Sequence, residues 1–269
     1  MKLARIMDGA GREVLAAQGE DGALYRCDGD TLLNPDALYI TKEKVPAKRF
    51  LPPVNPRALI CVAASYRKHI EECNLTEQPD PVVFMKNPAS VQGHECPVVI
   101  PAVCGDEVDY EGELAVVLSR DCRNVSEPQA LKCIAGYTVA NDVSARIWQL
   151  ERGGGQWVRG KSFDTFAPLG PFLVTPDEVG DPNNLKIRTV LNGEVVQEST
   201  TKRMIRGVAE LISFLSQGTT LLAGTVILTG TPDGVGWFRQ PRKLLRPGST
   251  VRVEIEKVGT LMNPVIAES

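Results

Sequence analysis

The sequence predicts an α+β fold that is mainly β, with a small N-terminal β-rich domain over residues 1–50 and a larger domain over residues 51–269. Short segments of alternating or continuous apolar residues recur along the chain, and Gly, Pro, Asn or Asp residues separate them. Few stretches have apolar residues at helical spacing. About ten strands against so few helices indicate β-sheets with helices at their periphery.

The composition is typical of a globular protein and argues against some classes of partner. Of the 269 residues, 43% are hydrophobic and 23% charged, and the net charge is −3. Basic residues do not cluster with aromatic ones, which argues against a nucleic-acid partner, and no run of about 18 apolar residues is present to cross a membrane. Seven scattered cysteines without a C-x-x-C pair favour reduced thiols. We expect a cytoplasmic protein, or a mitochondrial one if a presequence has been removed.

The N-terminal unit is expected to be antiparallel. Residues 2–6, 13–17 and 23–26 alternate in polarity, and Gly-rich or Asp-Gly turns lie between them. Residues 51–56 then include three prolines, which end regular structure. We place the boundary between the two domains there.

The larger domain is expected to contain most of the strands. Buried-strand or alternating patterns occur at residues 58–64, 81–85, 114–118, 137–140, 171–174, 226–229 and 251–256. Helical patterns occur at residues 66–73, 127–133 and 207–214.

Two local motifs sharpen this assignment. Asn192-Gly193 lies between two β-prone segments and predicts a type I′ hairpin, because both central residues of that turn need positive φ. Ser126 and Gln129 resemble a capping box at the start of the second helix. The hairpin favours antiparallel sheet.

Two glutamates lie at the start of a continuous apolar segment. Glu111 and Glu113 flank Gly112, so in a strand their side chains point to the same face. The glycine lets another backbone or a ligand come close. Two neighbouring carboxylates at the mouth of a buried strand repel each other, and burial adds to the cost of ionising both. A bound cation would remove both costs.

Asp142 is the candidate for a third oxygen ligand, because it follows the apolar run at residues 136–140. No histidine or cysteine adjoins these carboxylates, and an all-oxygen set suits Mg²⁺, Mn²⁺ or Ca²⁺ rather than zinc. The Glu-x-Glu spacing alone also fits the solvated face of an edge strand. Spacing therefore gives a metal-site hypothesis and leaves the alternative open.

Longer motifs around the carboxylates resemble the fumarylacetoacetate hydrolase family over residues 51–265. Four ordered segments carry the resemblance: DYEGEL at 109–114, GYTVANDVSAR at 136–146, GKSFDTFAPLGP at 160–171 and LTGTPDGVG at 228–236. The first 50 residues look like the variable N-terminal module of that family. The central segments are most similar to the branch that includes acylpyruvate hydrolases and oxaloacetate tautomerases.

The resemblance implies a mixed β-roll catalytic domain that is usually a homodimer. It implies a Mg²⁺ or Mn²⁺ ion, replaceable by Ca²⁺ in crystals, on the carboxylates that align with Glu111, Glu113 and Asp142. In such enzymes the ion holds the oxygens of a 2-oxo acid or 1,3-dicarbonyl substrate and stabilises its enolate. Lys161 aligns with a lysine that adds positive charge beside the enolate.

A helical pair provides a second element. His69 and Glu72 stand three residues apart, on one face of the expected helix. Such pairs are often surface ion pairs, but in hydrolytic relatives an aligned pair activates the attacking water. The resemblance therefore implies catalytic roles for His69, Glu72 and Lys161. It implies substrate contacts at Tyr66, Arg146, Gln149, Gly230 and Thr231.

These features favour a metal-dependent enzyme that hydrolyses a C–C bond of an acylpyruvate-type compound. The alternative is an oxaloacetate tautomerase or decarboxylase, which uses the same enolate without hydrolytic water. A non-catalytic binding module is a third interpretation, because two residues depart from the family pattern. Ser65 replaces an asparagine before the tyrosine, and Ile147 replaces an aspartate after Arg146. We expect the loss of the aspartate at position 147 either to free Arg146 for an anionic substrate or to change how Arg146 is held.

Overall fold

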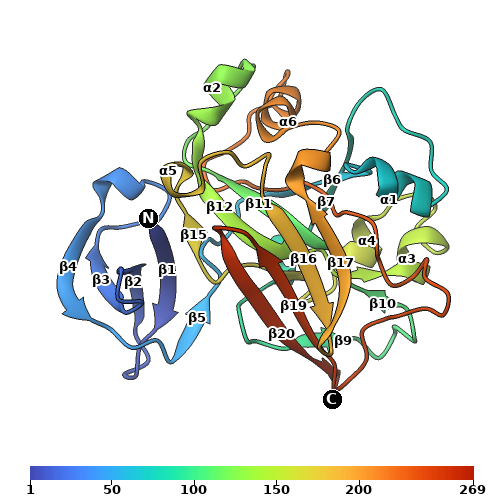
Figure 1. The fold of residues 1–269 in the computed structure, drawn as a ribbon, viewed down its shortest axis with the longest axis horizontal. Coiled ribbons are helices and arrows are strands. Elements are labelled where there is room, and N and C mark those ends of the chain that lie inside the picture. Colours follow the sequence, from blue (N-terminus) through green and yellow to red (C-terminus); the bar gives the residue numbers. More distant parts are fainter.

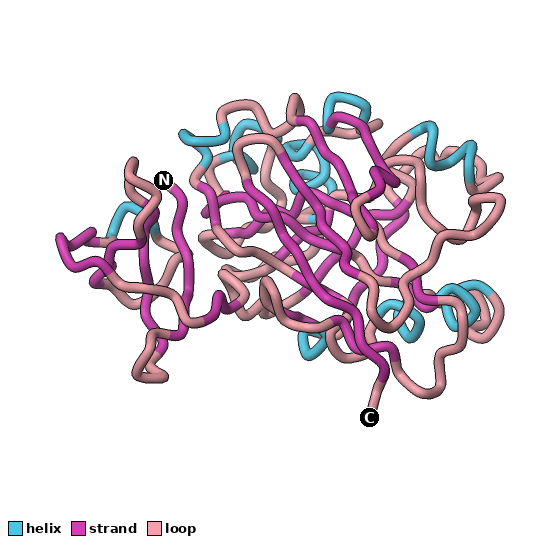
Figure 2. The backbone as a smooth tube through the Cα atoms, turned by 60° about the horizontal axis from the view of Figure 1, so that its bottom comes forward, coloured by secondary structure: helices cyan, strands magenta, loops and turns pink.

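The computed structural model describes residues 1–269 and confirms a mainly β fold. Strands form two main sheets and short helices lie around them (Figures 1 and 2). The larger sheet contains β1 (Lys2–Met7), β2 (Glu13–Gln18), β3 (Leu24–Asp28), β4 (Tyr39–Lys44), β5 (Arg49–Leu51), β6 (Leu59–Ala63), β7 (Val82–Lys86), β11 (Gly112–Leu118), β12 (Ile134–Asn141), β15 (Leu173–Val174) and β18 (Val226–Leu228).

The second sheet has five strands and covers the centre of the first. It contains β9 (Val98–Ile100), β16 (Lys186–Leu191), β17 (Glu194–Thr200), β19 (Thr250–Ile255) and β20 (Gly259–Ala267). Two short pairs complete the strands: β10 (Val108–Asp109) with β13 (Ser144–Ala145), and β8 (Val91–Gln92) with β14 (Ala167–Pro168).

The helices are short. They are α1 (Arg67–Glu72), α2 (Glu127–Leu131), α3 (Arg146–Leu150), α4 (Val158–Lys161), α5 (Pro176–Val179) and α6 (Val208–Leu215), with single 3₁₀ turns η1 (Pro35–Ala37), η2 (Pro88–Ser90) and η3 (Thr201–Arg203). None of them has both the length and the apolar character that a membrane crossing requires.

The N-terminal strands form a lobe at one side of the molecule (Figures 1 and 2). The three expected strands are present, and β4 and β5 extend them. This lobe is joined to the rest of the sheet, because β1 pairs antiparallel with β15 at Leu3↔Leu173. The proposed boundary near residue 51 falls at the end of β5, and the division into two domains stays a prediction.

The core lies between the two sheets. Every residue of β11 and β12 is buried. On the face toward the second sheet, Leu114 and Val139 share one apolar cluster with Val253, Ile255 and Leu261. Each such side chain contributes about 1.5–3 kcal/mol on burial. Because every residue of β11 and β12 is buried, both faces of these two strands are packed.

Local turn chemistry is as the sequence predicts. Asn192 and Gly193 have φ values of 52° and 86°, which confirms the hairpin between β16 and β17. The side chains of Ser126 and Gln129 form the capping box of α2. The predicted strand at 171–174 is shorter than expected, since only Leu173 and Val174 pair.

The topology brings several strand ends together. β11 runs antiparallel to both β12 and β18, and β18 runs parallel to β6. The first residues of β11 therefore lie beside the last residues of β12 and β18 and near the start of α1. Helices α1, α3 and α4 are at this end, away from the N-terminal lobe (Figure 1).

Candidate active site

Three carboxylates meet where β11 begins and β12 ends. Glu113 lies in β11, Glu111 just before it and Asp142 just after β12. Gly112 pairs with Asn141, and the Asp142 N–H donates to the Glu111 carbonyl oxygen at 2.8 Å. One oxygen from each carboxylate lies within 4.8 Å of the others, and all three side chains are buried. The structure brings the three predicted metal ligands together.

The surroundings of these carboxylates fit a bound cation. Glu113 accepts a hydrogen bond from the Gly230 N–H at 2.6 Å and forms no ion pair with a basic side chain. Burial raises the pKa of Glu113 well above its usual range, and the negative charges of Asp142 and Glu111 raise it further. A divalent ion would offset this repulsion, and three carboxylates are the donors that Mg²⁺ or Mn²⁺ prefers.

Lys161 bridges two of the carboxylates. Its Nζ lies 2.8 Å from Glu111 Oε2 and 2.9 Å from Asp142 Oδ2. Burial lowers the pKa of Lys161, but the charges of Asp142 and Glu111 outweigh this effect and raise it. Burial likewise raises the pKa of Glu111, but Lys161, Arg146 and His69 lower it to about 2. Lys161 is therefore a charged hydrogen-bond donor at neutral pH and cannot act as a base.

Lys86 is a buried cation that sequence reasoning missed. It ends β7, and its Nζ forms an ion pair with Asp142 Oδ1 and donates to the Val143 carbonyl oxygen at 3.1 Å. Asp142 therefore lies between the ammonium groups of Lys86 and Lys161. The contact joins residues 56 positions apart, so no local pattern could have revealed it.

Arg146 is held by two carboxylates and is not free. Its Nε donates to Asp109 Oδ2 at 2.9 Å, and its Nη1 lies 2.7 Å from Glu111 Oε1. Nη1 also donates to Gln149 Oε1 at 3.0 Å. Of the two expectations for the loss of an aspartate at position 147, the one that Arg146 is freed for a substrate is therefore wrong. Asp109 and Glu111 supply the negative charge that position 147 lacks.

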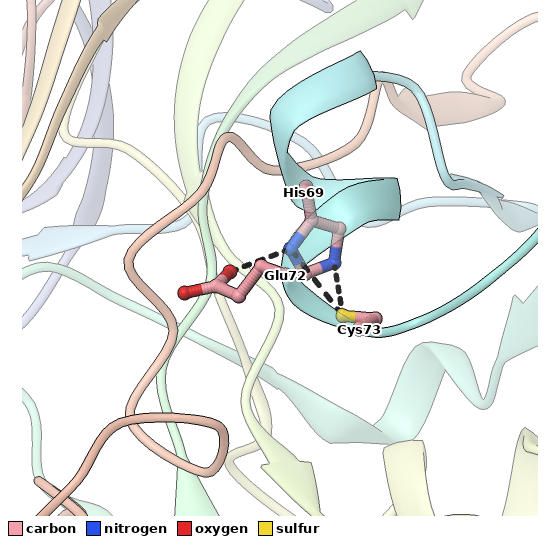
Figure 3. A group of neighbouring side chains, drawn as sticks. All are labelled: His69, Glu72 and Cys73. Atoms are coloured by element: carbon pink, nitrogen blue, oxygen red, sulfur yellow. Dashed lines mark hydrogen bonds and ion pairs between the residues drawn. The ribbon is translucent and has the colours of Figure 1, made fainter.

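The predicted pair of His69 and Glu72 is present on α1 (Figure 3). His69 Nδ1 lies 3.2 Å from Glu72 Oε2. The Gly234 N–H donates to both oxygens of Glu72, at 2.9 and 3.1 Å, and this fixes the carboxylate. The Cys73 Sγ lies 3.7 Å from each ring nitrogen of His69.

One cavity of about 200 Å³ joins His69 to the carboxylates. Its charged end is lined by Glu111, Glu113, Arg146 and Lys161. Its apolar walls are Val62, Leu75, Phe84, Leu150, Trp157 and Phe238. Gln149 and Thr231, two predicted substrate contacts, also line it. The charged end can orient a small anion while the apolar walls exclude water.

Two predicted substrate contacts lie behind the cavity lining. Tyr66 is 1% exposed and its hydroxyl has no hydrogen-bond partner; burial and the Glu113 charge raise its pKa. Gly230 has φ 96°, and a Cβ there would lie 2.4 Å from Ser65 Oγ. The glycine is needed because the backbone passes close to Ser65. Neither residue lines the cavity, so their substrate contacts stay predictions, while the Gly230 N–H holds Glu113.

Gln197 in β17 was also missed, and it links the second sheet to the site. Its Oε1 accepts from the Gly112 N–H at 3.0 Å and the Thr189 hydroxyl at 2.8 Å. Its Nε2 donates to the Thr231 hydroxyl at 2.8 Å and the Pro232 carbonyl at 2.9 Å. One buried amide therefore links Gly112, which lies between Glu111 and Glu113, to the Thr231 wall of the cavity.

Comparison with known proteins decides the family. The family model described as fumarylacetoacetate (FAA) hydrolase C-terminal matches residues 58–266. The chain belongs to the fumarylacetoacetate hydrolase family. Within this family, it is 47% identical over 218 residues to the human protein named oxaloacetate tautomerase FAHD2A, mitochondrial. That alignment covers 81% of this chain and 69% of the human protein.

Solved structures share the fold over the whole chain. The 5-carboxymethyl-2-hydroxymuconate delta-isomerase of Mycobacterium smegmatis has a TM-score of 0.85 and 36% identity, and each chain is covered completely. The 2-hydroxyhepta-2,4-diene-1,7-dioate isomerase of Mycobacterium marinum has a TM-score of 0.83 and 36% identity, with 100% of this chain and 99% of that chain covered. All three relatives carry names of tautomerases or isomerases.

Proposed function

We propose that the protein is a Mg²⁺- or Mn²⁺-dependent tautomerase of a small 2-oxo acid of the oxaloacetate type. One observation carries this proposal: a single cavity is lined by Glu111 and Glu113 of the buried carboxylate trio, by a charged lysine and by an oriented histidine. The names of the relatives support tautomerisation better than the acylpyruvate hydrolysis expected from the sequence. Family membership and the retained polar residues argue against a non-catalytic binding module.

The chain's own residues divide the work as follows. A divalent ion on Glu111, Glu113 and Asp142 supplies positive charge that stabilises the substrate's enolate. Lys161 donates a hydrogen bond where negative charge develops on the substrate oxygen. These interactions are strong because the cavity end is buried.

His69 is the group that moves the proton. Its Nδ1 is engaged by Glu72, so its Nε2 can remove the proton from the enol oxygen or place it on the neighbouring carbon. Tautomerisation shifts one proton between oxygen and carbon and breaks no C–C bond. It needs no water, which agrees with the apolar walls around the charged end.

The second candidate function is hydrolysis of a C–C bond in an acylpyruvate. The His69–Glu72 pair favours it, because the same imidazole could activate water. Decarboxylation of oxaloacetate would use the same enolate. The three outcomes differ in their products and can be separated in solution.

The test follows the ultraviolet absorbance of enol-oxaloacetate with purified protein and Mg²⁺, and measures pyruvate separately. Tautomerisation predicts faster enol decay without extra pyruvate, whereas decarboxylation predicts pyruvate. Cleavage of acetylpyruvate or fumarylpyruvate would instead support hydrolysis. Chelation of the metal and the substitution His69→Asn should each abolish the acceleration of enol decay. The control is His94→Asn, because His94 lies outside the cavity. Enol decay no faster than in buffer would refute the tautomerase proposal.

A further inference from the structure

A second group of side chains that could hold a metal ion lies at the edge of the cavity, and its donors are of a different kind. His69, Glu72 and Cys73 project from the last turn of α1 toward one another (Figure 3). We propose that these three residues form a zinc-class site, and that Zn²⁺ bound there inhibits the enzyme. The binding part of this proposal rests on geometry alone, and the inhibition rests on the proposed function.

The donor set selects zinc over magnesium. Imidazole nitrogen, thiolate sulfur and carboxylate oxygen are the ligands that zinc uses, whereas Mg²⁺ requires oxygen. The carboxylate trio on β11 and β12 offers oxygen alone. The two sites are therefore expected to sort hard and soft ions between them.

The spacing of the donors is close to one face of a zinc tetrahedron. Zinc–ligand bond lengths predict edges of about 3.4 Å between nitrogen and oxygen and about 3.6 Å between nitrogen and sulfur. His69 Nδ1 lies 3.2 Å from Glu72 Oε2 and 3.7 Å from the Cys73 Sγ. The remaining oxygen–sulfur edge lies within 4.8 Å, compared with about 3.6 Å in a zinc tetrahedron.

The cluster is both anchored and accessible. Positions 69, 72 and 73 fall on one side of α1 because they are three and four residues apart. The Gly234 N–H fixes Glu72, and His69 and Cys73 both line the cavity. A fourth position facing the cavity is left for water or for a substrate oxygen, as zinc sites with three protein ligands allow.

Coordination changes the state of the thiol and of the imidazole. Burial raises the pKa of Cys73 to about 12, so the metal-free residue is a neutral thiol. Zinc binding replaces the thiol proton, which passes to solvent, and the sulfur binds as thiolate. The same ion would bind Nδ1 of His69 in place of the Glu72 contact, so the neutral imidazole would carry its proton on Nε2 and have no free lone pair. The imidazole then cannot move a proton for the substrate.

Direct binding is measured with Co²⁺, because a cobalt–thiolate bond gives a charge-transfer band in the near ultraviolet. The Mg²⁺-loaded wild-type protein is titrated with Co²⁺, alongside Cys73→Ser and the matched control Cys96→Ser. Cys96 is half-buried and outside the cavity. The band is expected in wild type and C96S and lost in C73S. No band in wild type, or a band that persists in C73S, overturns the proposal.

Inhibition is measured with Zn²⁺ in a large excess of Mg²⁺, which keeps the carboxylate site filled. Each variant is compared with its own rate without zinc. We expect C73S to raise the zinc concentration for half inhibition by about tenfold or more, because loss of a ligand should cost at least as much as loss of an outer-shell partner. C96S should leave it near the wild-type value. Equal zinc sensitivity of C73S and wild type would place the inhibition elsewhere.

The two measurements separate the proposals. A cobalt–thiolate band in a protein without activity toward any 2-oxo acid would refute the proposed function and leave the zinc site standing. Activity without a band would refute the zinc site alone.

Discussion

Under the proposed function, Lys161 has two opposed effects, because its charge competes with a metal ion and also favours the enolate. Its ammonium pairs with Glu111 and Asp142, and it lines the cavity in which the proposed function places the enolate. We predict that Lys161→Met lowers kcat by about 100-fold, the loss typical of one electrostatic donor. The same change should tighten Mg²⁺ binding, because the carboxylates lose a competing cation. Calorimetry and steady-state kinetics check both parts, with the exposed Lys202→Met as control; weaker Mg²⁺ binding would contradict the electrostatic explanation.

Glu113 makes the metal-free protein sensitive to pH. Burial and its acidic neighbours raise its pKa above the ordinary value of 4.5, so the folded state favours the protonated carboxyl. That contribution to stability is complete below pH 4.5 and is lost as pH rises through the raised pKa. Chemical denaturation of metal-free protein should therefore show a loss of stability with rising pH that Glu113→Gln lacks and that Mg²⁺ suppresses. A pH dependence identical in wild type and variant would show that Glu113 ionises normally.

At the scale of the elements, Gly112 lets β11 pass against the second sheet. A Cβ at this position would lie 2.2 Å from Thr189 Oγ1 and 3.0 Å from Val253 Cγ1. Gly112→Ala should reduce the free energy of unfolding by about 1–3 kcal/mol, as overpacking does, and weaken Mg²⁺ binding. Urea denaturation tests this, with Gly105→Ala as control because open space surrounds that residue. Adding Thr189→Ala should restore part of the loss, and a double variant no more stable than Gly112→Ala would contradict the clash.

The elements also show what the sequence can predict and what it cannot. The hairpin at Asn192-Gly193 and the capping box at Ser126 were predictable, because turns and caps depend on neighbouring residues. The carboxylate trio was predictable from motifs. Lys86 and Gln197 were not, because their roles arise from contacts with distant strands. The residues next to a polar side chain in a strand do not indicate whether that side chain will be buried against a distant partner.

At the scale of the whole molecule, the N-terminal lobe and the larger domain share one sheet. Leu3 is fully buried and packs in a cluster with Ala135 and Leu173 of the central strands. Leu3→Ala should cost about 2–5 kcal/mol and shift one single unfolding transition to lower temperature. Calorimetry tests this, with the exposed Leu131→Ala as control. Two transitions, of which only one moves, would instead show that the predicted division near residue 51 separates independent domains.

We also propose that the protein is a homodimer, as the family resemblance implies. In the end strand β7, Val83 and Met85 are each more than 40% exposed. Met85 and Val158 line the same surface hollow. Light scattering should give twice the chain mass of 29.2 kDa, and Met85→Glu should halve it. Ile40→Glu, on the opposite end strand β4, is the matched control. A monomer for the unmodified protein would refute the proposal.

The Gln197 amide has a consequence for how substrate preference can change. It ties a hairpin that lines no part of the cavity to the turn that does. Substitutions in β16 and β17 that tilt this amide would move the Thr231 wall relative to the carboxylates without altering any contacting side chain. Mutant libraries restricted to the pocket surface would therefore omit positions that tune selectivity, and natural drift in this hairpin offers a route to new substrates that preserves the metal ligands.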